Sequence, residues 1–150
     1  MGIVNIVKNI KQIHAKDIVL IRIGKFFYTY GKDAYILSYL FQYKLMNIEG
    51  ESIYSCAFPA QSFSKVIAHI ENKKINYIVV DKRNNYDIEE KSDNKNLNTY
   101  EEQFEKAKKY VNLKIRIENI SYYLLKHIYD EKTTQKISKM EEIINETRKV

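Results

Sequence analysis

An aromatic strand between two glycines constrains the fold of this chain more than any other segment. Residues 24–34 read Gly-Lys-Phe-Phe-Tyr-Thr-Tyr-Gly-Lys-Asp-Ala and follow a β-branched apolar run over residues 18–23. Because side chains alternate between the two faces of a strand, Phe26, Tyr28 and Tyr30 are predicted to share one face. Such a row can fill a core, or it can stack on bases while flanking lysines meet phosphates. The segment predicts a pair of strands and leaves both roles open.

Hydrophobic periodicity predicts further elements on either side of this segment. Apolar residues at helical spacing indicate helices, and apolar runs bounded by turn residues indicate short strands. Strands are expected over 18–23, 26–30, 44–48, 52–57 and 77–80, and helices over 3–15, 32–43 and 63–71. This order predicts an α/β (α+β) fold, in which helices flank a mixed β-sheet.

A polar stretch divides the chain. Residues 1–85 form the predicted α/β domain, and residues 86–98 a polar connector in which Tyr86 and Ile88 are possible edge-strand residues. Residues 99–150 are predicted to form a C-terminal helical extension. Its longest apolar stripe comprises Leu113, Ile117, Ile120, Leu124 and Ile128. One amphipathic helix cannot bury such a face alone, and a hairpin with a final helix over 133–147 would leave much of it open. The stripe therefore predicts a homodimer, with the helical hairpin, docking on a partner protein or docking on the core as alternatives.

The net charge is unevenly distributed along the sequence. Residues 1–85 carry 12 Lys and Arg against 6 Asp and Glu, whereas residues 86–150 carry 13 of each. The excess of +6 therefore lies entirely in the predicted α/β domain. A basic domain is expected of a protein that binds a phosphate backbone, although ordinary solubilising charge explains the same numbers equally well.

Several function classes find no support in the sequence. No apolar run reaches the roughly 18 residues of a membrane span, and the single cysteine, Cys56, excludes an intramolecular disulfide. His14, His69 and His127 are far apart and show no spacing typical of a metal site. There is no catalytic constellation and no phosphate-binding loop. We therefore expect a cytoplasmic, non-enzymatic protein without ATPase activity, metal or another cofactor.

Two blocks of the sequence resemble the N-terminal, mismatch-binding domain (domain I) of the DNA mismatch-repair protein MutS. The first block matches the family at Gly24, Phe26, Asp33 and Ala34, with Phe27 and Tyr30 in place of other aromatic residues. In the second block, residues 57–62 occupy the position of a proline-containing loop, followed by a helix and a short strand over 77–80. The resemblance covers residues 3–85 and implies an α/β domain that binds double-stranded DNA.

The resemblance also implies how DNA would be contacted. In the family, the phenylalanine at the position of Phe26 stacks on a mispaired base, and a glutamate two residues later hydrogen-bonds that base. Here the glutamate position is Tyr28, and a phenol donates or accepts hydrogen bonds whereas a carboxylate only accepts them. The family's Tyr-His pair in the loop is replaced by Ala60-Gln61. These departures argue against family-style mismatch discrimination.

The predicted DNA-binding residues combine aromatic rings, lysines and the start of a helix: Phe26, Tyr28, Lys25, Lys32, Gln61, Ser62, Lys65 and Lys82. The rings would stack or insert, and the cations would contact phosphates. The alternatives are packing beneath the N-terminal helix for the rings and solvated surface positions for the lysines. Two hypotheses follow. The chain is a non-catalytic DNA-binding protein, or it is a protein-interaction or regulatory subunit with the same fold that has lost DNA binding.

Overall fold

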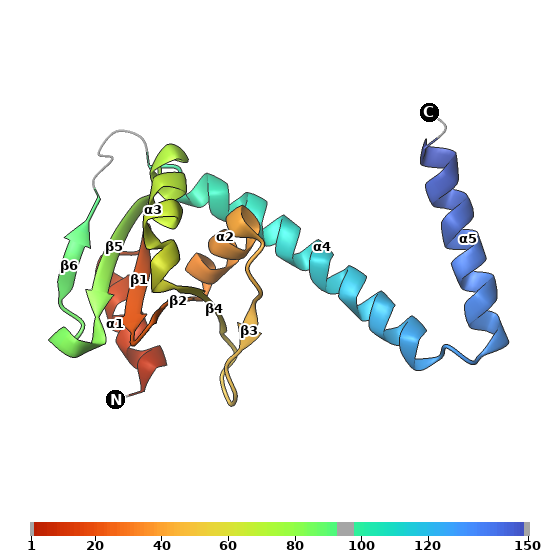
Figure 1. Cartoon of the computed structure of the whole chain (residues 1–150), viewed down its shortest axis with the longest axis horizontal. Helices are drawn as coiled ribbons and strands as arrows, with labels where there is room; N and C mark the ends of the chain where they lie inside the picture. Colours follow the sequence, from red (N-terminus) through yellow and green to blue (C-terminus); the bar gives the residue numbers. More distant parts are fainter. Residues whose placement is uncertain (1, 93–97, 149–150) are drawn as a thin grey trace. The chain divides into compact units, whose positions relative to one another are not determined.

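A computed structural model of the chain describes residues 2–92 and 98–148. In chain order the elements are α1 (Ile3–Ile13), β1 (Asp17–Ile23), β2 (Phe26–Tyr30), α2 (Lys32–Phe41), β3 (Met46–Asn47), β4 (Tyr54–Pro59), the short 3-10 helix η1 (Ala60–Ser62), α3 (Phe63–Asn72), β5 (Asn76–Asp81), the 3-10 helix η2 (Lys82–Asn84), β6 (Ile88–Lys91), α4 (Tyr100–Lys126) and α5 (Glu131–Arg148) (Figure 1). Contacts between residues divide the chain into unit 1, residues 1–111, and unit 2, residues 112–150. The first turns of α4 therefore belong to unit 1.

The six strands of unit 1 form one mixed sheet in the order β3-β4-β2-β1-β5-β6. The central neighbours β1 and β5 are parallel, whereas the other neighbouring strands are antiparallel. The predicted α+β fold, with a mixed sheet flanked by helices and a helical C-terminal extension, is confirmed.

Alternate residues of β1 point into two apolar clusters on opposite faces of the sheet. Ile18 and Leu20 pack with residues of α2, α3 and the start of α4 in the larger cluster. Val19 and Ile21 pack with residues of α1 in the smaller one. A strand that is covered on both sides reads as a continuous apolar run, which explains why residues 18–23 show little alternation.

A buried carboxylate joins four elements of unit 1. Asp33, in the first turn of α2, accepts hydrogen bonds from the Tyr100 hydroxyl (2.6 Å), the Val19 N–H (3.0 Å) and the Lys11 ammonium (3.0 Å). Burial raises the pKa of the Asp33 carboxyl, and Lys11 and Tyr100 oppose that shift. Burial and the neighbouring Asp33 also raise the pKa of Tyr100. Because Tyr100 begins α4, this network ties the start of α4 to α1, α2 and the sheet.

The two edges of the sheet differ from the prediction in detail. The strand predicted over 44–48 is reduced to β3, because α2 ends at Gln42 in a left-handed conformation (φ 59°) and Tyr43 and Leu45 then pack against the core. At the other edge, β6 begins at Ile88, inside the predicted connector, and pairs with β5. Residues 93–97 of that connector lie outside the described residues. The division of the chain into an α/β domain over 1–85, a connector over 86–98 and a helical extension over 99–150 stays a prediction.

Candidate nucleic-acid interface

A two-residue turn, Gly24-Lys25, joins β1 to β2 and fixes the position of Phe26. Gly24 has a φ of 63°, which glycine adopts without steric cost and which suits the first central residue of a tight hairpin. Across the hairpin Phe26 lies opposite Ile23, and on the other side of β2 it lies opposite Pro59. The ring of Phe26 therefore stands at the end of the sheet, beside two chain reversals.

Phe26, Tyr28 and Tyr30 form the predicted row of rings on one face of β2. Neighbouring ring centroids are 6.4 Å apart between Phe26 and Tyr28 and 6.5 Å apart between Tyr28 and Tyr30. Phe26 is 45% exposed, Tyr28 is half-buried and Tyr30 is buried. Tyr30 belongs to the cluster beneath α1, and burial raises its pKa to about 12. Both predicted roles therefore occur in one row, with core packing at Tyr30 and an exposed ring at Phe26.

A backbone hydrogen bond brings the start of α3 beside the hairpin turn. The Ala60 N–H donates to the Lys25 carbonyl at 2.9 Å, so η1 lies next to the turn. Gln61 is exposed and Ser62 is half-buried. The Ser62 side chain makes no hydrogen bond that caps α3, so a role as the helix cap does not account for this residue.

The parallel pairing of β1 and β5 adds basic residues to the same edge, because the carboxyl ends of parallel strands meet. Arg22 lies opposite Asp81, and the exposed Lys82 follows. Arg83 donates to the Asp81 carboxylate at 3.0 Å, and this hydrogen bonding lowers the pKa of Asp81. Sequence reasoning did not single out Arg22 or Arg83, whose only signal is their position at the ends of apolar runs.

Five of the predicted residues therefore lie where the strands of the sheet end, beside the β1–β2 turn, on a surface that we call the turn edge: Lys25, Phe26, Gln61, Ser62 and Lys82. Tyr28 follows Phe26 inward along β2. Two lysine ammonium groups, one amide, one hydroxyl and an exposed ring are thus available within one surface. Such a surface is chemically suited to phosphates and to the flat faces of bases.

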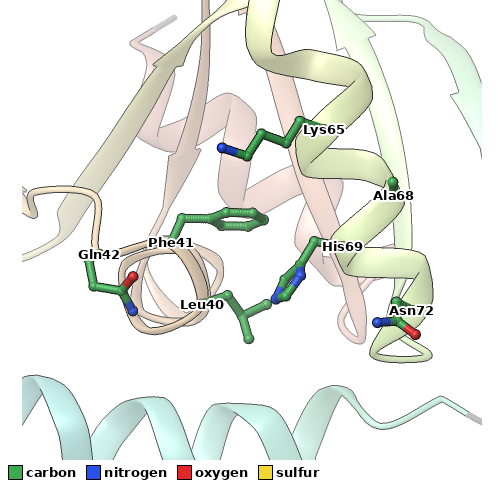
Figure 2. Close-up of a pocket in the computed structure, with 7 residues that line it drawn as sticks. All are labelled: Leu40, Phe41, Gln42, Lys65, Ala68, His69 and Asn72. Atoms are coloured by element: carbon green, nitrogen blue, oxygen red, sulfur yellow. The ribbon is translucent and has the colours of Figure 1, made fainter.

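Two other predicted lysines lie apart from the turn edge. Lys32 follows the far end of β2, where its ammonium is 4.8 Å from the centroid of the Phe104 ring. Lys65 is in the first turn of α3, and Figure 2 shows its side chain extending over Phe41. It helps to line a cleft of about 510 Å³, together with Leu40, Phe41, Gln42, Ala68, His69 and Asn72. This cleft lies on the face covered by α2 and α3, opposite the face of the aromatic row.

The described part of the chain shows no metal site, no reactive cysteine and no membrane-spanning helix. Among the described residues no three His, Cys, Asp or Glu side chains are placed to hold a metal ion. Cys56 is buried, and burial raises the pKa of its thiol to about 12, as expected of a packed side chain rather than a nucleophile. No helix within residues 2–92 and 98–148 is long and apolar enough to cross a membrane.

Comparison with known protein families places the chain in one of them. No curated protein matches the chain. The family model for MutS domain I matches residues 1–116, a range that includes the sheet, the turn edge and the Asp33–Tyr100 hydrogen bond. Because this match covers more than half of the sequence, the chain belongs to the MutS domain I family.

Proposed function

We propose that this protein binds double-stranded DNA through the turn edge. Its family makes unit 1 a DNA-binding-like domain, and MutS domain I is itself non-catalytic. The observation that carries the proposal is the exposure of Phe26, at 45%, while the adjacent Phe27 is only 3% exposed. An exposed aromatic ring on the same surface as Lys25 and Lys82 can stack on a base while the two cations contact phosphates.

In this proposal the lysines and the ring have separate tasks. Lys25 and Lys82 neutralise phosphates, which releases counterions and supplies affinity without sequence preference. Phe26 inserts between base steps from the minor groove, where an apolar wedge unstacks and kinks the duplex. Tyr28, between Phe26 and Tyr30 in the row, presents a hydroxyl that donates or accepts a hydrogen bond.

A second candidate function keeps the fold and replaces DNA with a protein partner. Tyr28 favours this alternative, because it occupies the position of the family's base-contacting glutamate and supplies no carboxylate there. The chain would then be an interaction or regulatory subunit in which Phe26 contacts another protein. Phe26 is suited to either role, so the choice depends on whether the lysines contact phosphates.

The salt dependence of duplex binding tests the role of the lysines. The full-length chain is expected to bind a matched duplex with an affinity that falls steeply as salt rises. Lys25→Gln and Lys82→Gln should each reduce the slope of log affinity against log salt by about one. Lys73→Gln is a matched control, because this exposed lysine follows α3 at the opposite end of the sheet. Equal slopes for all three variants would contradict the assigned surface.

Phe26→Ala tests the wedge. Binding should weaken by about 1–3 kcal/mol if the ring stacks on a base, with the melting temperature nearly unchanged because the ring is half exposed. Ile13→Ala is the control, since Ile13 is 81% exposed and precedes the other end of β1. Mismatched, bulged and single-stranded probes in the same titration report the preferred DNA. Absence of binding to every probe by the folded chain would leave the protein-interaction alternative.

A further inference from the structure

Five aromatic rings form a row on the face of the sheet that α2 and α3 cover. In order they are Phe63, Phe27, Phe58, Tyr43 and Phe41, and the centroids of successive rings are 4.8, 5.4, 6.0 and 5.4 Å apart. The planes of successive rings differ by only 15° to 22°. Phe27 and Phe58 are buried, whereas the rings at the two ends are half-buried. The row therefore fixes the orientation of Phe41, its last ring, at the surface of unit 1.

Phe41 lines the cleft of about 510 Å³ between the end of α2 and one side of α3 (Figure 2). The His69 ring stands across Phe41, with the two centroids 5.1 Å apart and the planes at 62°. Figure 2 shows the Lys65 side chain on the other side of the Phe41 ring. The cleft thus has an aromatic wall with polar groups on either side of it.

The polar side chains of this cleft carry positive charge and no negative charge. Lys65 contributes an ammonium group, His69 an imidazole and Asn72 an amide, and none of the seven lining residues is acidic. Within residues 2–92 and 98–148, no hydrogen bond or ion pair engages these three side chains. An ammonium group suits a phosphate, whereas an amide and an imidazole donate and accept hydrogen bonds. The lining is therefore complementary to a ligand that is both anionic and aromatic.

We propose that this cleft binds a nucleotide, with its base on Phe41 and its phosphate on Lys65. Bases stack on aromatic side chains, and a ring that the row already holds in place loses little freedom when a base stacks on it. Asn72 and His69 are then available to the polar edge of the base. A cleft of this volume is in the range of small-molecule sites. A ligand with a carboxylate alone would use Lys65 and leave the ring without a partner.

A free nucleotide and an unpaired nucleotide of a single strand share this chemistry. The bases of a matched duplex are stacked on their neighbours, so a protein stacks its rings on bases that are splayed out of a helix. The cleft is consequently a second site, apart from the turn edge, and it does not rest on the proposed binding of a duplex there.

Calorimetric titration of the full-length chain with dAMP tests the proposal. The dAMP should bind about tenfold more tightly than deoxyadenosine or inorganic phosphate, because each of these lacks one half of the ligand. Lys65→Gln and Phe41→Leu should each weaken dAMP binding about fivefold or more. Lys8→Gln is the matched control, because this exposed lysine belongs to α1 on the opposite face of the sheet. Melting curves check the fold of Phe41→Leu, and the exposed Lys65 can be replaced without disturbing the core.

Further probes identify the source of the nucleotide and separate this site from the turn edge. A single strand of six deoxyadenosines that binds more tightly than dAMP, and is weakened by the same two variants, would assign the cleft to a strand. Equal affinities would assign it to a free nucleotide. Phe26→Ala should weaken duplex binding and leave dAMP binding unchanged, so either site can fail without the other. No binding of dAMP at millimolar concentration, equal binding by all variants, or equal competition by hexaglutamate would overturn the proposal.

Discussion

Isoleucines supply the interior of unit 1 and the surface of unit 2. Ile18, Ile21 and Ile36 are fully buried, whereas Ile117 and Ile128 are each 56% exposed. Ile36 and Ile117 are helical, Ile18 and Ile21 lie in β1, and Ile128, predicted as part of the helical stripe, lies in the turn that follows α4. Periodicity therefore identifies an apolar face, but it does not say whether the same chain covers that face.

The hydrogen-bond partners of polar groups also differ between the two units. In unit 1 the buried Asp33 carboxylate has three donors from three other elements. In unit 2 the Thr133 hydroxyl donates to the His127 carbonyl six residues away, and the exposed Lys136 ammonium contacts the Tyr123 hydroxyl of α4. Unit 1 is consequently a structure that depends on long-range contacts, and unit 2 depends on helix propensity and on whatever packs against it.

Removing the Asp33 carboxylate should have the largest effect on stability, and this effect should be confined to unit 1. Asp33→Ala leaves the buried Tyr100 hydroxyl and the partly buried Lys11 ammonium without this acceptor, which should cost about 3–5 kcal/mol of the free energy of unfolding. Urea denaturation followed by tyrosine fluorescence measures the loss. Asp87→Ala removes an exposed acid of unit 1 and should change stability by less than about 0.5 kcal/mol. Similar losses for both variants would show that the network does not hold unit 1 together.

The same truncation in the two units gives a direct comparison. Ile36→Ala in α2 should cost about 2–5 kcal/mol, because it leaves a cavity in a closely packed core. Ile117→Ala in α4 should change monomer stability by less than about 0.5 kcal/mol. Both residues are helical, so differences in helix propensity cancel. The measurement is urea denaturation at a protein concentration too low for self-association, and a large effect of Ile117→Ala there would mean that unit 2 is closed within one chain.

A smaller effect is expected from the cap of α5. The Asp130 carboxylate accepts a hydrogen bond from the Lys132 N–H at 2.9 Å, the pattern of a helix N-cap. Asp130→Ala should therefore destabilise α5 by about 0.5–2 kcal/mol and lower the helical circular dichroism signal without shifting the unfolding of unit 1. Asn145→Ala, at an exposed position inside α5, should preserve or raise helicity. A shift in the unfolding of unit 1 by Asp130→Ala would contradict the local character of unit 2.

Local patterns in the sequence predict most of unit 1. The alternation of Phe26 to Tyr30, the helix after Gly31 and the apolar run over 77–80 each follow from neighbours in the chain, and all three are confirmed. The strand β6 was indicated only by Ile88 as a possible edge-strand residue, because all four of its side chains are exposed and show no apolar alternation. Backbone pairing with β5, rather than hydrophobicity, makes it a strand.

Features that depend on distant residues were not predictable. Asp33 reads as an ordinary acidic residue at a helix start, and its burial follows from Tyr100, which is 67 residues away. The candidate site shows the same limit. The aromatic row was predictable from spacing, whereas the parallel pairing of β1 with β5, which sets Arg22 opposite Asp81 and next to the strand end that carries Arg83, was not. Whether the eight predicted residues bind DNA stays a prediction.

The length of the Gly24-Lys25 turn determines which phenylalanine meets solvent. A shift of one residue in strand register moves every side chain to the opposite face, so an insertion in this turn would turn Phe27 outward and Phe26 into the core. The length of the loop between β3 and β4 does not set the position of Phe26 in the same way. Surface loops tolerate added residues at small entropic cost. Among related chains, insertions should therefore accumulate between β3 and β4. A relative with a longer turn between β1 and β2 should lack an exposed ring at the position of Phe26.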